Sequence, residues 1–472
     1  MGKNMDNYID FMNLIRTNYS QNTAFEYFDD ELNVKSVTYN DFYNDVCVVA
    51  EHIEELGFAG KNLGICTENS YLWFVYYYAV GVTGNVAVLL SHNLPKKEHH
   101  RLAEWTDVQY MFVSENYPEL SEGIEHELMT FPKRDNTDKK LKDMIIKKED
   151  MACVLFSSGT TGNVKGVCLS NENCLYAANT SMLAQTQSDT ACRMLCTLPF
   201  YHIGAVALAT LLTSGGTICI LNSPKYFWKA VKVMKPTVLV VVPMYVEMIK
   251  KKIMKSKNAG SVIEGVSSIT CSGAFLSVEC IKLFAQNGVT LINGYGMTET
   301  AGMGSYTYYD IVNNKISGKI YDGLKIDIVD NEVVITSKSV MMGYYKNPQE
   351  TAKILRNGSL YTGDLGYFDE NGCLRITGRK KNLIILSNGE NISPEEIENE
   401  LLNCENISEC LVYEEDGKIA IKIVKNGKNA DEKEIREKIA EYNSSVLFYR
   451  QIRNIYFVDE LPKNETGKII RY

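Results

Sequence analysis

Residues 157–167 read Ser-Ser-Gly-Thr-Thr-Gly-Asn-Val-Lys-Gly-Val, and no other stretch of the chain is as informative. They follow the apolar run 152–156, which predicts a buried strand. The loop at the carboxyl end of a buried strand is where open α/β sheets bind ligands. Backbone N–H groups, several hydroxyls and one cation together predict a loop that cradles phosphate. The residues that supply these groups are Ser157, Ser158, Gly159, Thr160, Thr161, Gly162 and Lys165.

The spacing in this loop differs from that of the common nucleotide-binding loop. A Walker A loop needs Gly, four residues, then Gly-Lys-Ser/Thr. Here the position five after Gly159 is Val164, and Lys165 is followed by Gly166, so the ordinary P-loop NTPase is excluded. A glycine-rich turn without a ligand is the simpler interpretation, but the fixed residue types along the whole stretch favour phosphate binding.

Length and composition limit the classes of protein to consider. A chain of 472 residues is too long for one compact core, so two or more domains are expected. Hydrophobic content of 45% and charged content of 23% are ordinary for a soluble globular protein. The net charge of −9 gives no sign of a nucleic-acid surface, which needs a basic stripe. The 13 cysteines contain no Cys-x-x-Cys pair, so they predict neither a zinc site nor a disulfide framework and favour a reducing, cytoplasmic location.

Two long uncharged stretches, 70–95 and 203–224, require a test for membrane spans. Glycines and polar residues interrupt both stretches, whereas a spanning helix is a more continuous apolar run. Each stretch is therefore predicted as a helix, a glycine turn and a buried strand, with the strands at 86–90 and 217–221. No membrane span is expected, and the N-terminus lacks the apolar region of a signal peptide.

Helix and strand patterns alternate over the first two thirds of the chain, which predicts a parallel sheet with helices on its faces. Short strands with tight turns follow, at 325–329, 332–336 and 374–377. Ser393 is then predicted to cap a helix that begins at Pro394, and Asp416-Gly417 marks a hairpin. We therefore predict an α/β multidomain fold. It has a large N-terminal α/β domain (1–380) with a small β-rich subdomain (318–378), and a smaller C-terminal α+β domain (381–472).

Two further segments carry side chains suited to a nucleotide. In the segment 294–300, Thr298 and Glu299 offer the hard oxygens that Mg²⁺ prefers, and Tyr295 offers a flat face to a purine. A turn with a capping threonine is an equally good interpretation of that segment. In the segment 361–366, Asp364 follows a glycine, and its carboxylate can accept both ribose hydroxyls, although Gly-Asp is more often a plain turn.

Two single residues are weaker candidates. Lys468 ends the segment 461–468 near the C-terminus, where a lysine is usually a solvated charge. His202 lies in the segment 198–204, and a lone histidine is more often a packed or surface residue than a catalyst.

Together these segments resemble the signatures of the adenylate-forming superfamily. That superfamily contains the acyl- and aryl-CoA synthetases, the adenylation domains of peptide synthetases and the beetle luciferases. The segments occur in the family's order between residues 157 and 468, and the resemblance covers nearly the whole chain. Val164 stands where the family usually has proline, which concerns loop stiffness rather than phosphate chemistry.

The resemblance implies a role for each matched residue. Two segments would enclose the adenine, with Gly273, Ala274, Asn293, Gly294, Tyr295 and Gly296. Asp364 and Arg379 would hold the ribose, and Lys381 would be the hinge of a mobile C-terminal domain. Lys468 would be the catalytic lysine, because a positioned cation relieves the charge gathered when a carboxylate attacks a phosphate. Lys165 and His202 complete the catalytic set, and Asn388 and Gly389 would line a tunnel for the pantetheine thiol.

The implied reaction joins a small carboxylic acid to coenzyme A through an acyl adenylate, with ATP and Mg²⁺. No aspartate occurs in residues 198–224 to pair with an amine, which argues against an α-amino acid substrate. A largely apolar acyl pocket is expected from Val241, Val242, Pro243, Ile203 and Met303. Fatty, aryl and dicarboxylic acids all stay open as substrates.

Three different functions would share these motifs. An acyl carrier protein could accept the acyl group in place of coenzyme A, since it carries the same pantetheine arm. A non-catalytic nucleotide-binding protein would keep the cradle without the reaction, although Lys165, Glu299, Asp364 and Lys468 are all intact. A luciferase-like oxygenase would carry every one of the motifs.

Overall fold

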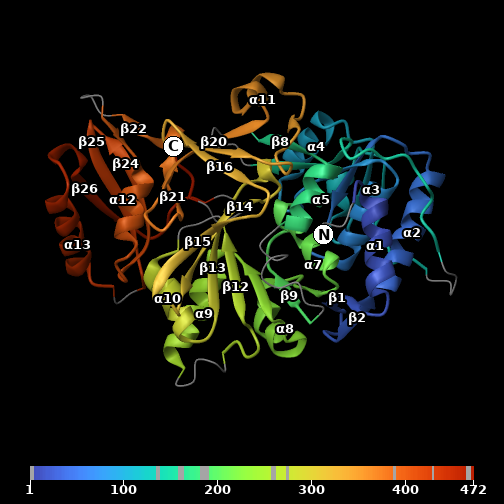
Figure 1. The fold of residues 1–472 in the computed structure, drawn as a ribbon, viewed down its shortest axis with the longest axis horizontal. Coiled ribbons are helices and arrows are strands. Elements are labelled where there is room, and N and C mark those ends of the chain that lie inside the picture. Colours follow the sequence, from blue (N-terminus) through green and yellow to red (C-terminus); the bar gives the residue numbers. More distant parts are fainter. Residues whose placement is uncertain are drawn as a thin grey trace.

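The computed structural model describes residues 5–133, 139–157, 164–180, 191–256, 262–272, 276–385, 390–427, 430–463 and 469–471. Two large sheets, one five-stranded sheet and a C-terminal α/β unit make up the described chain (Figure 1). The predicted α/β multidomain class is confirmed, with a large N-terminal domain and a smaller C-terminal one.

A nine-stranded sheet forms one half of the large domain. Its six middle strands are parallel, and antiparallel strands close it at both edges. In spatial order the strands are β15 (Lys315–Ile320), β14 (Gly304–Asp310), β13 (Thr290–Gly296), β12 (Ser268–Ser272), β11 (Val238–Val241), β9 (Arg193–Cys196), β10 (Thr217–Ile220), β1 (Thr23–Phe28) and β2 (Val34–Thr38).

A seven-stranded sheet forms the other half. Five of its strands are parallel, and two antiparallel strands lie at one edge. In spatial order they are β18 (Gly343–Tyr344), β8 (Lys165–Ser170), β7 (Met151–Ser157), β4 (Val86–Leu89), β3 (Asn62–Cys66), β5 (Tyr110–Val113) and β6 (His126–Leu128).

One hydrophobic core joins both large sheets through five helices. These helices are α1 (Tyr8–Tyr19), α2 (Tyr39–Glu55), α3 (Tyr71–Val82), α5 (Asn171–Thr180) and α7 (Ile203–Thr213). Eleven of the twelve residues of α3 are buried, which explains its apolar sequence without a membrane. The two stretches tested for membrane spans form α3 with β4 and α7 with β10, as predicted. Among the described residues, no helix has the length and apolar character needed to cross a membrane.

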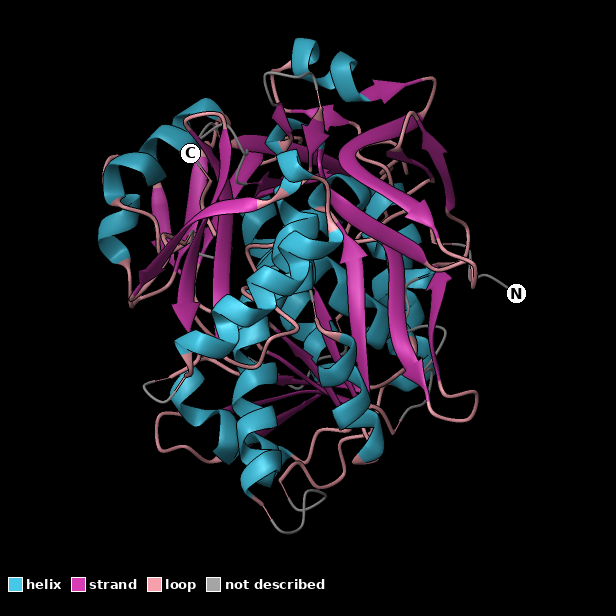
Figure 2. Cartoon of the chain, turned by 90° about the vertical axis from the view of Figure 1, so that its left-hand side faces the viewer, coloured by secondary structure: helices cyan, strands magenta, loops and turns pink. Residues whose placement is uncertain are grey.

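The outer faces of the two sheets are covered by further helices. A second core lies under α8 (Phe227–Met234), α9 (Pro243–Lys255) and α10 (Val278–Gln286) on the nine-stranded sheet. A smaller core lies under α4 (Lys96–Trp105) on the seven-stranded sheet. The layers of strands and helices are visible from the C-terminal side (Figure 2).

The β-rich part of the chain forms a five-stranded sheet, although one predicted piece of it lies elsewhere. The sheet contains β16 (Lys325–Val329), β17 (Glu332–Thr336), β19 (Leu355–Arg356), β20 (Ser359–Phe368) and β21 (Leu374–Arg379). Between β17 and β19 the chain returns to the seven-stranded sheet, where β18 pairs with β8, and then forms α11 (Pro348–Ile354).

The C-terminal unit has a hydrophobic core of its own. It contains β22 (Ile384–Ile385), β23 (Asn391–Ile392), α12 (Pro394–Leu401), β24 (Ile407–Glu415), β25 (Lys418–Lys425), α13 (Glu432–Ser445) and β26 (Ile452–Val458). The hairpin predicted at Asp416-Gly417 joins β24 to β25, and both turn residues have positive φ, as a primed turn requires.

Candidate active site

The predicted phosphate loop connects two antiparallel strands. β7 ends at Ser157 and β8 begins at Lys165, and these two residues lie opposite each other in the pairing. The chain thus leaves the loop into a strand and not into a helix. Ser158, Gly159, Thr160, Thr161 and Gly162 lie outside the described residues.

Lys165 joins this loop to the segment predicted to hold a metal. Its Nζ lies 3.0 Å from Glu350 Oε2 and 4.5 Å from the centre of the Tyr344 ring. The Tyr344 hydroxyl donates a 2.9 Å hydrogen bond to Glu299 Oε1. Burial and the nearby Glu299 carboxylate raise the pKa of Tyr344, so this hydroxyl stays a donor. One line of contacts therefore connects Lys165 to Glu299.

Thr298 and Glu299 stand side by side in a 3₁₀ turn, Thr298–Thr300. Glu299 is buried, and its carboxylate is oriented by Tyr344. These hard oxygens suit Mg²⁺, which binds proteins through one or two carboxylates and completes its shell with water and phosphate. Among the residues that the structure describes, no three acidic, His or Cys side chains form a cluster that could hold a metal ion by itself.

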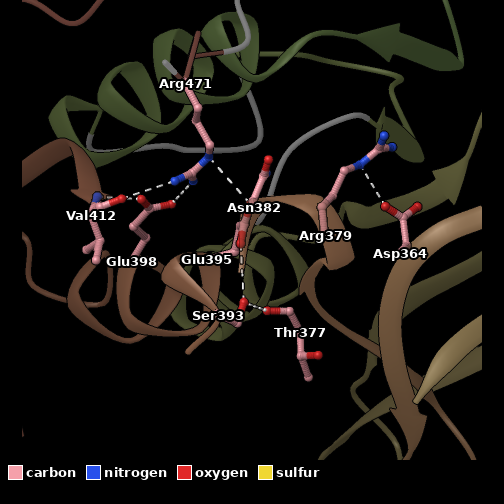
Figure 3. A network of polar contacts seen from close by, with 9 residues as sticks. All are labelled: Asp364, Thr377, Arg379, Asn382, Ser393, Glu395, Glu398, Val412 and Arg471. Carbon is pink, nitrogen blue, oxygen red and sulfur yellow. Dashed lines mark hydrogen bonds and ion pairs between the residues drawn. The ribbon is translucent and has the colours of Figure 1, made fainter. Parts of the chain in front are cut away.

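Tyr295, Asp364 and Arg379 form a second line of contacts. The Tyr295 hydroxyl donates to Asp364 Oδ2 at 2.7 Å. Arg379 Nε lies 2.7 Å from Asp364 Oδ1 (Figure 3). Asp364 and Arg379 lie opposite each other on β20 and β21. Burial and the adjacent carboxylate raise the pKa of Tyr295 well above its ordinary value.

One predicted adenine segment, 293–296, lies at the end of β13, which pairs in parallel with β12. Asn293 and Gly294 are half-buried near the end of β13, and Gly294 lies opposite Ser272, the last residue of β12. Gly296 approaches the backbone of Gly302 so closely that a Cβ would overlap its carbonyl oxygen. Gly273 and Ala274 lie outside the described residues.

The proposed hinge, Lys381, lies near two other cations. Burial lowers the pKa of Lys381 to about 8; the cations of Arg379 and Lys165 act in the same direction, and the Glu395 carboxylate acts against them. Lys381 lies in a 3₁₀ turn, Lys380–Asn382, between β21 and β22.

The residues predicted for the acyl pocket have different environments. Met303 and Val241 are fully buried, and Val241 belongs to the core under α9. Val242 and Pro243 are half-buried at the start of α9. His202 is half-buried, immediately before α7, with its ring 4.8 Å from that of Tyr201. The side chain of Ile203 lies outside the described part of the structure.

Sequence reasoning missed three residues of this region: Tyr344, Glu350 and Glu332. Glu332 accepts a 2.9 Å bond from the Gly363 N–H, and its other oxygen lies 3.0 Å from Lys380 Nζ. It thereby holds the turn before Asp364, where Gly363 has φ +72°. The only feature of the sequence that draws attention to Tyr344 is the stretch Tyr-Tyr-x-Asn-Pro at 344–348.

A polar network connects the C-terminal tail with the proposed hinge (Figure 3). The Ser393 hydroxyl donates to the Thr377 carbonyl at 2.5 Å and does not cap α12, although the helix begins where predicted. Glu395 accepts a 2.6 Å bond from Asn382 and pairs with Arg471 at 3.4 Å. Asn388, Gly389 and Lys468 lie outside the described residues, so the thiol tunnel and the catalytic lysine stay predictions.

Arg471 also neutralises a buried carboxylate. It forms a short ion pair with Glu398, whose other oxygen accepts a 2.6 Å bond from the Val412 N–H. Burial raises the pKa of Glu398 to about 7 although Arg471 is beside it. The ion pair between Arg471 and Glu398 thus fixes the tail to α12 and β24, since a buried carboxylate is costly without a partner.

Replacing Arg471 should destabilise the protein in a pH-dependent way. Arg471→Ala leaves Glu398 unpaired, and such a loss typically costs about 3 kcal/mol of unfolding free energy. The folded-state pKa of Glu398 then rises further, so the cost grows from pH 6 to pH 8 and shrinks when the carboxyl is protonated. Urea unfolding at both pH values measures this. The matched variant Arg471→Ala/Glu398→Gln should recover most of the loss, and equal losses with and without Glu398→Gln would contradict the pairing.

Comparison with known proteins gives a family match and several related enzymes. Residues 16–345 match the model described as AMP-binding enzyme, and residues 396–468 match its C-terminal domain. Peroxisomal OPC-8:0-CoA ligase 1 of Arabidopsis thaliana is 28% identical, over 94% of this chain and 89% of that protein.

Two solved structures share the fold. The anthranilate CoA ligase AuaEII, in complex with anthranoyl-AMP, has a TM-score of 0.85 and 19% identity, and the match covers 98% of this chain and 95% of that one. The o-succinylbenzoate coenzyme A synthetase of Bacillus subtilis, in complex with ATP and a magnesium ion, has a TM-score of 0.82 and 22% identity, and 98% of each chain is covered.

Proposed function

The chain belongs to the AMP-binding enzyme family, and we propose that it is an AMP-forming acid–CoA ligase. A carboxylate attacks the α-phosphate of ATP, which gives an acyl adenylate and pyrophosphate. The thiol of coenzyme A then attacks the acyl carbon and releases AMP. The observation that carries the proposal is the pair of contact lines around one site: Lys165 to Glu299, and Tyr295 to Arg379 through Asp364.

The described residues have distinct roles in this proposal. Lys165 exchanges Glu350 for phosphate oxygens, while Asp364 accepts the ribose hydroxyls with its orientation fixed by Tyr295 and Arg379. Thr298 and Glu299 would hold Mg²⁺, which neutralises charge on the phosphates during attack. Lys165, Arg379 and Lys381 add the positive charge that a triphosphate needs.

The second half of the proposal concerns residues 381–472. We place the domain boundary after residue 380, with Lys381 as the hinge and Lys468 as the cation delivered for adenylation. Rotation about the hinge would withdraw Lys468 and bring Asn388 and Gly389 to the thiol tunnel. Such a rotation must break the Ser393–Thr377 hydrogen bond, because its two residues lie on opposite sides of Lys381.

The substrate is proposed to be a carboxylic acid without an α-amino group. The sequence around His202 contains no aspartate, and the neighbouring strand β11 is apolar. Burying an unpaired amine costs several kcal/mol or forces it to lose its proton. Aryl, fatty and dicarboxylic acids all satisfy this condition.

Matched substrate pairs should separate acids from amino acids. ATP–pyrophosphate exchange should respond to hydroxyphenylpropanoate and to a branched aliphatic acid, and should not respond to tyrosine or leucine above background. The penalty for the unpaired amine predicts a difference of at least about 10²-fold in exchange rate. Exchange with the amino acids and none with their deaminated partners would make the protein an amino-acid adenylase.

The acyl acceptor and the cellular location of the enzyme are two separate proposals. An acyl carrier protein could replace coenzyme A, and thioester formation with each acceptor in the same assay distinguishes them. A cytoplasmic location is proposed from the scattered thiols, while the Arabidopsis relative is peroxisomal by name. A non-catalytic nucleotide-binding role is disfavoured by the contact lines that orient Glu299 and Asp364.

A further inference from the structure

The loop that carries His202 is held by a side chain from the other large sheet. Asn69 follows β3 of the seven-stranded sheet, whereas the loop 197–202 follows β9 of the nine-stranded sheet. The Asn69 side chain accepts a 2.9 Å bond from the Phe200 N–H through Oδ1 and donates a 2.8 Å bond to the Leu198 carbonyl through Nδ2. The Asn69 carboxamide therefore makes two hydrogen bonds to the loop backbone, as the backbone of a neighbouring β-strand would.

The side chains of the same loop are anchored by neighbouring elements. The Phe200 ring is fully buried and lies 4.9 Å from Phe74 of α3. The Tyr201 hydroxyl accepts a 3.2 Å bond from Asn93, which follows β4. His202 comes next, as the residue before α7, and its own N–H donates to the Pro199 carbonyl at 3.1 Å.

We propose that Asn69 is a positioning residue for acid activation, and that it acts by fixing the His202 loop against the acid-binding region. The inference rests on the proposed function, since it assigns Asn69 a part in the adenylation step only. Asn69 is three residues beyond Cys66, the end of β3, and both of its hydrogen bonds described above go to the loop backbone. Its effect reaches the substrate through the backbone of residues 198–202.

The amide of Asn69 is required for both bonds at once. Asn69→Ala removes both, whereas Asn69→Asp keeps the acceptor for Phe200 but sets an oxygen against the Leu198 carbonyl, which has no proton to offer. Neither change replaces a residue predicted to bind the nucleotide. A shift of about 1 Å in a positioning group typically costs about 10²-fold in rate.

The test is a double-mutant cycle on acid-dependent ATP–pyrophosphate exchange. Asn69→Ala should lower the maximal exchange rate by about 10²-fold, with the KM for ATP changed by less than about twofold. In a His202→Ala background the same substitution should have little further effect, because residues that act as one unit are non-additive. Asn69→Asp should resemble Asn69→Ala.

Controls separate the positioning role from general damage and from a wrong function. Thermal unfolding shows whether each variant is folded, and Asn93→Ala tests the second anchor if Asn69→Ala is unstable. Losses that multiply in the double mutant, or a raised KM for ATP with unchanged maximal rate, would overturn the proposal.

If the wild-type protein shows no exchange with any acid, the proposed function fails. The two hydrogen bonds from Asn69 to the loop are then tested by amide hydrogen exchange at Phe200. Asn69→Ala should accelerate this exchange at least about tenfold, the factor that corresponds to 1.4 kcal/mol. Unchanged protection at Phe200 would refute the holding role of Asn69.

Discussion

Lys468→Ala should lower the rate of acyl-adenylate formation by a factor on the order of 10²–10³ and leave thioester formation from supplied acyl adenylate near normal. The physical reason is that attack of a carboxylate on the α-phosphate gathers negative charge from both partners. Removing one preorganised charge contact from such a transition state typically costs this factor. The second step has no such requirement, since the thiol attacks a carbonyl and AMP leaves.

The two half-reactions are measured separately, by ATP–pyrophosphate exchange and by thioester release from synthetic acyl adenylate. Lys463→Ala is a matched control in the same tail, because Lys463 forms an ion pair with Glu409. This control should leave both half-reactions unchanged. Equal damage to both by Lys468→Ala would remove the role assigned to that lysine.

Lys381→Pro should abolish thiol transfer while adenylation survives. Proline fixes φ, and a domain rotation about residue 381 needs a large change in that backbone. Thioester formation is therefore expected to fall by at least about 10²-fold, while pyrophosphate exchange stays within a few-fold of normal.

Lys381→Ala is the matched control for the charge of this residue. It keeps backbone freedom and removes a cation whose pKa is about 8 because of burial beside Arg379 and Lys165. Thiol transfer should survive in Lys381→Ala. A Lys381→Pro variant that completes thioester formation at the normal rate would refute the hinge.

The fold class followed from local patterns, but several pairings did not. The apolar runs correctly predicted β10 and the helix and glycine turn before it. A strand that is buried on both faces is apolar along its whole length, and this pattern is visible in the sequence. β18 has only two residues and pairs with β8 far away in the sequence, and no local pattern encodes such a partner. Its position explains why Tyr344 was missed.

One contact of the candidate site was predictable from the family resemblance. The resemblance assigned Asp364 and Arg379 to the same ribose, and the β20–β21 hairpin places them opposite each other. Glu350 could not be paired with Lys165 from the sequence, because 185 residues separate them. Ser393 was predicted to cap α12, yet its hydroxyl bonds the Thr377 carbonyl, since tertiary contact outweighed the local option.

The assignment as an AMP-forming acid–CoA ligase is tested most directly by identifying the products of one turnover mixture. The protein is incubated with ATP, Mg²⁺, coenzyme A and each acid of the panel, and nucleotides and thioesters are quantified. We expect equal amounts of AMP, pyrophosphate and acyl-CoA for at least one acid, with none of the three formed when the acid is omitted. Formation of ADP and phosphate, or AMP release without any thioester to coenzyme A, would contradict the assignment.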